Sequence, residues 1–312
     1  MEYGRTAIMR SRHRMILRTL LILAVGCFLS TPVLAHTGSG IAVDRFGQVY
    51  FLDTGSGLWK IDAHGGLTHL SGLKNHWLAL DANDRFAQAR LPTDPAQDWV
   101  ITRVSASPTL LISTDFPIAI GEDGNLYYPS GRSGDLRIVR AMPSGETAVL
   151  APLPLTATGA PLPHINGITA GPDCSLYYTE NTVIRRITAE GRISIVATVR
   201  ALARGPSIPG TNQHPYLRGL AVDARGVMYV ADNGDARVLK ITPEGKITTV
   251  VQLQGPWSPT GVALFGSDVY VLEFLHTPED DRRAWLPRVR KITSDGKSTI
   301  IATVDRMPGA RD

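Results

Sequence analysis

The stretch GLAVDARGVMYVADNGDARVLKITPEGKITTVV, residues 219–251, contains four short apolar segments in a row, separated by turns. The same order recurs in copies that begin at Gly40, Pro117, Gly167 and Gly261. In each copy an apolar run ends in an acidic or small polar residue and is followed by a basic and apolar run and then by a run led by glycine. Internal repeats of this kind are typical of proteins in which each unit buries its apolar faces against its neighbours.

A sixth, less regular copy begins at Trp77, between the copies that begin at Gly40 and Pro117. Its segment WLALD aligns with the first column of the repeat, and we place WVITRV (residues 99–104) and TLLIST (109–114) in the third and fourth columns. The intervals between first columns run from 37 to 52 residues, enough for four short strands. The sequence therefore predicts an all-β fold, a six-bladed β-propeller of four-stranded antiparallel blades that start near residues 40, 77, 117, 167, 219 and 261.

The first 35 residues have the features of a secretory signal peptide, with five arginines, an apolar segment from Thr19 to Leu29 and a small-residue cleavage site that ends at Ala35. Cleavage there predicts an exported protein, periplasmic or secreted, without stable membrane insertion, and a single domain over residues 36–312. Two alternatives remain open, a lipoprotein attached through Cys27 and an uncleaved membrane anchor.

The charge and the cysteine content of the predicted domain exclude some kinds of protein. Residues 36–312 carry 27 basic and 27 acidic side chains and are formally neutral. A neutral domain lacks the basic surface of a nucleic-acid-binding protein, so we expect no nucleic acid partner. Cys174 is the only cysteine after residue 35, which excludes an intramolecular disulfide.

The repeats also resemble known families. GLAVDARGVMYVADNGDARVLKI (residues 219–241) is similar to the NHL repeat, and GITAGPDCSLYYTEN (167–181) resembles blades of the virginiamycin B lyase family. Both resemblances point to the six-bladed propellers that include the SMP-30/gluconolactonase-like proteins, and they cover Gly40 to Val304. The resemblance implies the fold but no single activity, because such propellers host hydrolases, lyases and binding scaffolds.

The repeat predicts one working edge of the ring. In an antiparallel hairpin the start of the first strand lies beside the end of the second, and we call that edge the top edge. The long insertions, residues 91–98, 151–164, 200–218 and 274–287, all open there. Binding and catalytic residues gather on such loops.

Two groups of polar residues are expected at the top edge. Residues of different types precede the first strands, and this variety suits a site better than an architectural repeat. The ligand-binding and catalytic candidates in this group are His76, Asp115, Asn166 and Arg218.

The second group ends the second strands. Asp53 and Asp232 recur at equivalent positions, so we expect them to cap turns. Glu180 and Glu273 are long enough to reach inward and are ligand-binding candidates. Trp257 adds aromatic surface, which suits a sugar-like or amphipathic ligand.

The resemblance to the gluconolactonase-like family implies a metal site. Carboxylate and amide oxygens suit Ca²⁺ or Mg²⁺, and Asn166 and Asp115 are the candidate ligands. Asn166 with Gly167 matches a metal-binding Asn-Gly of that family, but no Glu precedes GIAVD, and Arg218 stands where an Asp is expected. An arginine there favours a carboxylate or phosphate group.

Two functions therefore stay open. The first is a propeller that binds a small polar molecule or a protein partner at the top of its channel, with no certain cofactor. The second is a divalent-metal-dependent hydrolase or lyase, lactonase-like, at the same place, with His76 or His276 as the catalytic base. The missing metal carboxylates favour binding.

Overall fold

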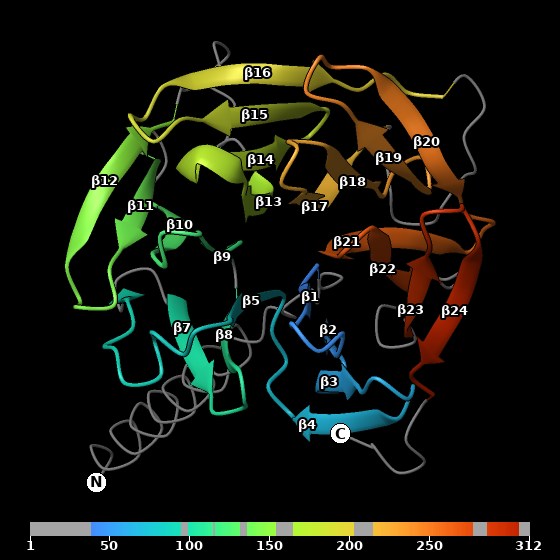
Figure 1. Ribbon diagram of the computed structural model, residues 1–312, viewed down its shortest axis with the longest axis horizontal. Helices are drawn as coiled ribbons and strands as arrows, with labels where there is room; N and C mark the ends of the chain where they lie inside the picture. The colour runs from blue at the N-terminus through green and yellow to red at the C-terminus, as the bar shows by residue number, and fades with distance from the viewer. Residues whose placement is uncertain are drawn as a thin grey trace, which may run out of the picture. The chain divides into compact units, whose positions relative to one another are not determined.

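The structure is a computed structural model that describes residues 39–94, 99–114, 116–131, 136–153, 165–202, 215–276 and 286–305. All of them belong to one compact unit. Their strands form six four-stranded antiparallel sheets, which Figure 1 shows as blades around a central axis. The predicted six-bladed propeller is confirmed. The predicted leader and Asp115 lie outside the described residues.

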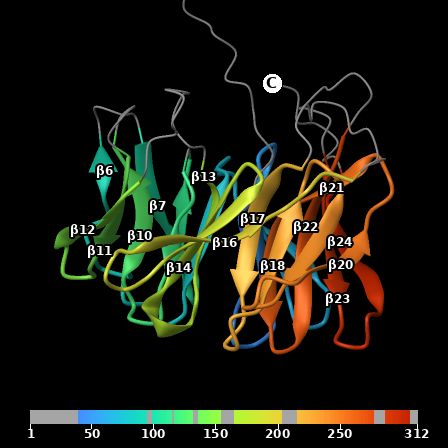
Figure 2. The same cartoon turned by 90° about the horizontal axis from the view of Figure 1, so that it is seen from above.

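The strands follow the chain blade by blade, and Figure 2 shows them running between the two edges of the ring. Blades 1 to 3 consist of β1 (Ile41–Val43), β2 (Val49–Asp53), β3 (Gly57–Ile61), β4 (Leu67–Ser71), β5 (Trp77–Asp81), β6 (Thr93–Asp94), β7 (Trp99–Val104), β8 (Thr109–Ser113), β9 (Ala119–Ile120), β10 (Leu126–Ser130), β11 (Arg137–Ala141) and β12 (Thr147–Pro152). Blades 4 to 6 consist of β13 (Ile165–Ala170), β14 (Leu176–Glu180), β15 (Val183–Ile187), β16 (Ile193–Thr198), β17 (Leu217–Val222), β18 (Met228–Asp232), β19 (Arg237–Ile241), β20 (Ile247–Gln252), β21 (Trp257–Phe265), β22 (Asp268–Leu275), β23 (Pro287–Ile292) and β24 (Ser298–Thr303).

Helix is almost absent from this part of the chain. A short 3-10 helix, η1 (Pro172–Cys174), precedes β14. Within the described ranges no helix is long and apolar enough to cross a membrane.

Five blades have the strand order of the repeat, but blade 2 does not. Its order from the channel outward is β5-β8-β7-β6, so the prediction that residues 109–114 form the outermost strand was wrong. All five residues of β8 are buried, as expected for a strand covered on both faces, whereas Val100 of β7 is 46% exposed. TLLIS also ends in a small polar residue, like the second strands of the other blades.

Apolar side chains fill every seam between neighbouring blades. In β14, Tyr177 packs toward blade 5 and Tyr178 toward blade 3, because successive side chains of a strand point to opposite faces. The ring closes between blades 1 and 6 in the same way, with Phe51 and Phe274 in one cluster. Within the described ranges each of these two blades has four strands of its own, and side-chain packing joins them. Burying one such side chain contributes roughly 1.5–3 kcal/mol.

The turns at the edge opposite the top edge use the predicted Asp and Gly residues. Gly226, between β17 and β18, has a φ of 78°, and Gly245, between β19 and β20, has a φ of 82°. Side chains rarely adopt this conformation, so glycine is required there.

Asp123 holds the turn between β9 and β10. Its carboxylate accepts hydrogen bonds from the Tyr127 hydroxyl (2.6 Å) and from the Asn125 side chain (2.7 Å). Burial alone would raise the pKa of Asp123, but these hydrogen bonds outweigh burial and hold it below its ordinary value of 3.8. A lowered pKa stabilises the fold above pH 3.8, and that stabilisation is lost as the pH falls through the folded-state pKa.

We therefore expect the D123N variant to lose about 1 kcal/mol of unfolding free energy at pH 7. The loss should shrink at pH 3, below the ordinary value of 3.8, because the unfolded-state carboxyl group is then largely protonated and the lowered pKa stabilises the fold less. Urea denaturation of both proteins at the two pH values measures this. An equal loss at both would contradict the assignment.

Candidate functional site

The top edge brings together the two sets of residues that the repeat predicts there. Ile165, at the start of inner strand β13, pairs with Glu180 at the end of β14. In blade 2, Trp77 at the start of β5 pairs with Ser113 at the end of β8. Polar residues at these two kinds of position therefore lie at one edge.

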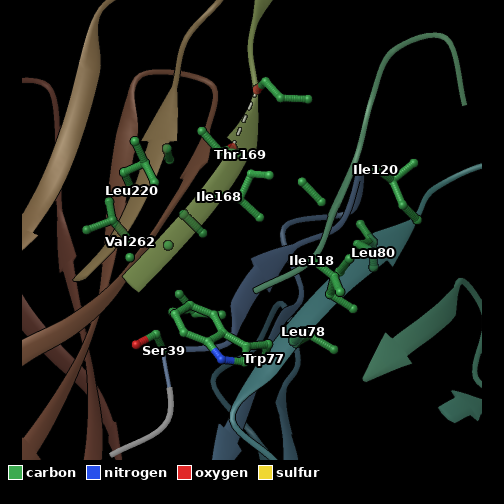
Figure 3. Close-up of a pocket in the computed structure, with 18 of the residues that line it drawn as sticks. Ser39, Trp77, Leu78, Leu80, Ile118, Ile120, Ile168, Thr169, Leu220 and Val262 are labelled. Carbon is green, nitrogen blue, oxygen red and sulfur yellow. Dashed lines mark hydrogen bonds between the residues drawn. The ribbon is translucent and has the colours of Figure 1, made fainter. Parts of the chain in front are cut away.

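A cavity of about 270 Å³ runs along the central channel and is lined by the inner strands of all six blades. Most of the lining is aliphatic. Among the described lining residues, the polar side-chain groups are the hydroxyls of Ser39 and Thr169 and the indole N–H of Trp77. Figure 3 shows Trp77 and Ser39 at the same end of the cavity, with Leu80 and Ile120 toward the other. The channel is thus lined mainly by aliphatic side chains, with Ser39 and Trp77 at its top end and Thr169 farther from that end.

Glycines let the inner strands approach one another at the top of the channel. A Cβ added to Gly261 would lie 2.4 Å from the carbonyl oxygen of Ser39 in blade 1. One added to Gly219 would lie 2.8 Å from the Cα of Gly261, and one added to Gly167 would lie 2.6 Å from the Arg218 carbonyl. The small residues of the inner strands thus allow the close packing that a narrow channel needs.

Asp53 caps the hairpin that follows β2. Its carboxylate accepts hydrogen bonds from the backbone N–H groups of Gly55 (3.1 Å) and Ser56 (2.9 Å) and from the Ser56 hydroxyl. Burial raises the pKa of Asp53, although these hydrogen bonds act in the opposite direction. The carboxylate is occupied by its own turn, in keeping with the predicted architectural role.

Asp232 belongs to a buried charge cluster in blade 5. Its carboxylate and that of Asp235 are both fully buried, and Arg237 binds them at 2.8 Å and 3.2 Å. Arg237 also donates a hydrogen bond to the backbone carbonyl of Arg200, which follows the last strand of blade 4. Burial raises the pKa of Asp232, and the hydrogen bond and charge of Arg237 counteract that effect.

The two glutamate candidates also have arginine partners. Glu180 accepts a hydrogen bond from Arg185 at 2.8 Å, across the hairpin of β14 and β15. Glu273 is fully buried and binds both Arg288 and Arg290 at 2.5 Å. A ligand would compete with these arginines for either carboxylate, so ligand binding by Glu180 and Glu273 stays a prediction.

Asn166 links blades 4 and 5. Its side-chain N–H donates to the Leu217 carbonyl (3.0 Å), and its side-chain oxygen accepts from the Tyr216 hydroxyl (3.2 Å). Arg218 directly follows Leu217, and its backbone carbonyl accepts a hydrogen bond from the Thr179 hydroxyl (2.7 Å).

Metal binding by Asn166 with Asp115 stays a prediction, since Asp115 is outside the described residues. Over the described ranges, no three His, Cys, Asp or Glu side chains are grouped so that they could hold a metal ion.

His76 is the half-buried residue that links blades 1 and 2. Its carbonyl accepts hydrogen bonds from the backbone N–H groups of Ser39 and Gly40, both at 2.9 Å. Its Nδ1 lies 2.5 Å from the Thr114 carbonyl, which only accepts, so Nδ1 carries a proton. In the neutral ring this makes Nε2 the basic nitrogen.

His276 is buried beside two residues that the sequence did not single out. Its Nε2 lies 2.5 Å from the Ser258 hydroxyl oxygen, which also accepts a hydrogen bond from the Asn233 side chain at 2.8 Å. Ser258 and Asn233 are 25 residues apart, and no local pattern connects them. Trp77 was missed as well, although it is the aromatic residue that begins an inner strand.

Comparison with known proteins supports the fold. A family model described as the SMP-30/Gluconolactonase/LRE-like region matches residues 129–272, somewhat less than half of the chain. The predicted NHL-type repeat is compatible with this match. Mouse teneurin-3 is 24% identical over 254 residues, and the chain spans about 9% of its length.

Two solved structures with TM-scores above 0.5 support the fold. Regucalcin from Agrobacterium tumefaciens, described as a calcium-binding protein, is 16% identical, with a TM-score of 0.51 over 78% of this chain and 84% of that one. A luciferin-regenerating enzyme is 15% identical, with a TM-score of 0.52 over 83% and 91%. Virginiamycin B lyase from Staphylococcus aureus is 18% identical, with a TM-score of 0.47 over 88% and 87%. This chain is thus a six-bladed β-propeller whose residues 129–272 match the model of the SMP-30/Gluconolactonase/LRE-like region.

Proposed function

We propose that this protein is an exported propeller that binds a small amphipathic molecule at the top end of its central channel. The observation that carries the proposal is the 270 Å³ cavity with aliphatic walls, which has Trp77 and Ser39 at its top end. Small-molecule sites are concave and mostly apolar, with a few polar groups that orient the ligand. Export rests on the leader-like residues 1–35 alone.

The polar candidates lie where such a ligand would carry its polar groups. His76, Asn166 and Arg218 each directly precede a lining residue of an inner strand, namely Trp77, Gly167 and Gly219. An apolar part of the ligand would lie against Trp77 and the aliphatic walls. Its polar part would face the top edge, where Arg218 favours an anionic group.

Titration with anilinonaphthalene sulfonate (ANS), a fluorescent molecule with apolar rings and one anionic group, tests this site. We expect saturable binding to the wild type and about tenfold weaker binding to W77A, because a buried tryptophan dominates the binding energy of an apolar site. W77F should lie between the two.

The matched control is F46A, which removes a 59% exposed aromatic ring from the opposite edge and should leave ANS binding unchanged. Equal binding to W77A and wild type, or loss of binding in F46A, would contradict a site at the top of the channel.

The second candidate is a metal-dependent hydrolase or lyase, lactonase-like, at the same edge. The match to the SMP-30/gluconolactonase/LRE-like model favours it, and His76, whose protonated Nδ1 leaves Nε2 as the basic nitrogen of the neutral ring, is the candidate base. Regucalcin is described as calcium-binding, and in this chain Asn166 and Asp115 would hold Ca²⁺ or Mg²⁺.

Calorimetry with Ca²⁺ and Mg²⁺ tests this candidate, with N166A as the variant. Binding of neither cation to the wild type, or equal binding to wild type and N166A, would contradict this metal site.

A further inference from the structure

Among the described residues at the top edge of blade 6, two positive charges meet one negative charge. Glu273 is fully buried, and each of its oxygens lies 2.5 Å from the Nε of an arginine, Oε2 from that of Arg288 and Oε1 from that of Arg290. Two guanidinium groups therefore share one carboxylate. Both arginine side chains are only 16% exposed, so water screens the extra charge weakly.

The two arginines differ in what else they bind. Arg290 donates to the Ser298 hydroxyl (2.9 Å) and makes a second contact with Glu273 at 3.3 Å. Arg288 donates to Glu273 only through Nε, and its two terminal nitrogens form no hydrogen bond with any residue in the described ranges. The unbalanced charge of the cluster therefore lies at the outer end of Arg288.

Arg288 is also held in place. The centre of its guanidinium group lies 3.6 Å from the centroid of the Trp257 ring, a close cation–π contact. Glu273 fixes the inner edge of the group, and Trp257 covers one face. The remaining edge carries the terminal N–H groups in the geometry that binds two oxygens of one anion.

The equivalent positions of blades 4 and 5 lack this imbalance. Among the described residues, Glu180 of blade 4 pairs with Arg185, and in blade 5 Arg237 binds both Asp232 and Asp235, so arginines do not outnumber carboxylates in these contacts. The unmatched arginine is thus a feature of blade 6, and the architecture shared by the blades does not require it.

We propose that Arg288, stacked on Trp257, is an oxyanion-binding site that accepts a carboxylate or phosphate group of a ligand at the top edge of blade 6. Because Glu273 and Trp257 already hold the guanidinium group, little conformational entropy is lost on binding. The site lies outside the channel cavity and does not depend on the channel binding the same molecule.

Titration calorimetry of the full chain with inorganic phosphate and with benzoate, at low ionic strength, tests the proposal. At least one of the two anions should bind the wild type and bind R288Q at least tenfold more weakly. The matched control is R185Q, which removes an arginine from the charge-balanced pair of blade 4 and should bind as the wild type does. W77A should also bind normally, which separates this site from the channel.

Two further variants identify the anion and guard against misfolding of R288Q. R288K keeps the charge without the planar fork, so it should retain phosphate binding and lose benzoate binding if the natural group is a carboxylate. W257L keeps Arg288 but removes the ring that holds its guanidinium group, so this variant should bind the anion several-fold more weakly than the wild type. Absence of binding to the wild type, or equal binding to wild type, R288Q and W257L, would overturn the proposal.

Discussion

The R237M variant is expected to lose about 3–5 kcal/mol of unfolding free energy at pH 7. Arg237 is the shared partner of Asp232 and Asp235, whose side chains are fully buried. Without the guanidinium group, the two buried carboxylates lose the cation that they share. Proteins of this size are stable by roughly 5–15 kcal/mol, so this single change removes a large part of the total.

The loss should depend on pH in a defined direction. Burial already raises the pKa of Asp232 above its ordinary value of 3.8, and removing Arg237 raises it further. A carboxyl group with a raised pKa binds more protons in the folded state, so its contribution favours folding at low pH and is lost as the pH rises through the folded-state pKa. The deficit of R237M should therefore be smaller at pH 4 than at pH 7.

Urea denaturation of wild type, R237M and the double variant D232N/R237M measures these effects. The double variant also removes the charge of Asp232 and should recover part of the loss. The control is R185M, whose loss should be about 1 kcal/mol because Arg185 is 22% exposed, against 8% for Arg237. A loss below 1 kcal/mol in R237M, or no dependence on pH, would show that the cluster does not stabilise blade 5.

The G261A variant should lose about 3 kcal/mol, because the added methyl group has no space. Its Cβ would lie 2.4 Å from the Ser39 carbonyl oxygen and 2.9 Å from a methyl carbon of Ile41. Both contacts belong to blade 1, so blades 6 and 1 must separate to admit the methyl group. Within the described ranges no exchanged strand holds these two blades together, and the seam relies on packing.

Thermal unfolding of G261A and of G72A provides the comparison. Gly72 has no heavy atom within 4 Å of an added Cβ, and its backbone does not require glycine. G72A should therefore unfold close to the wild-type temperature. If G261A did so too, close packing at the seam between blades 6 and 1 would not limit the stability of the ring.

Local patterns were sufficient to predict most of the fold. Apolar runs such as those of β14 and β18 recur at the same place in each repeat, and glycines such as Gly226 mark the tight turns. Both signals depend on a few neighbouring residues, so they can be recognised from the chain alone. Blade 2 was the exception, because strand order depends on which segment is buried on both faces. The segment TLLIS is apolar enough to be buried on both faces, but the spacing of the repeat suggested that it forms the outermost strand.

The candidate site was less predictable from the sequence. The sequence placed His76, Asn166 and Arg218 at one edge, but it did not show that Asn166 binds Tyr216, 50 residues away in the next blade. Nor did it show that Arg288 and Arg290 share Glu273. Such pairings depend on which blades are neighbours and on the path that a long side chain takes across a hairpin.

The sequence by itself thus determined the number of blades, most of their strands and the edge at which unlike polar residues gather, because strand periodicity and turn chemistry are local. Tertiary structure alone decided the strand order of blade 2, the apolar walls of the channel and the partner of each buried charge. Those features follow from packing between segments far apart in the chain. A buried charged group is stable only beside a partner, and the fold decides which partner lies within reach and which groups, such as the guanidinium of Arg288, keep an edge that binds no described residue.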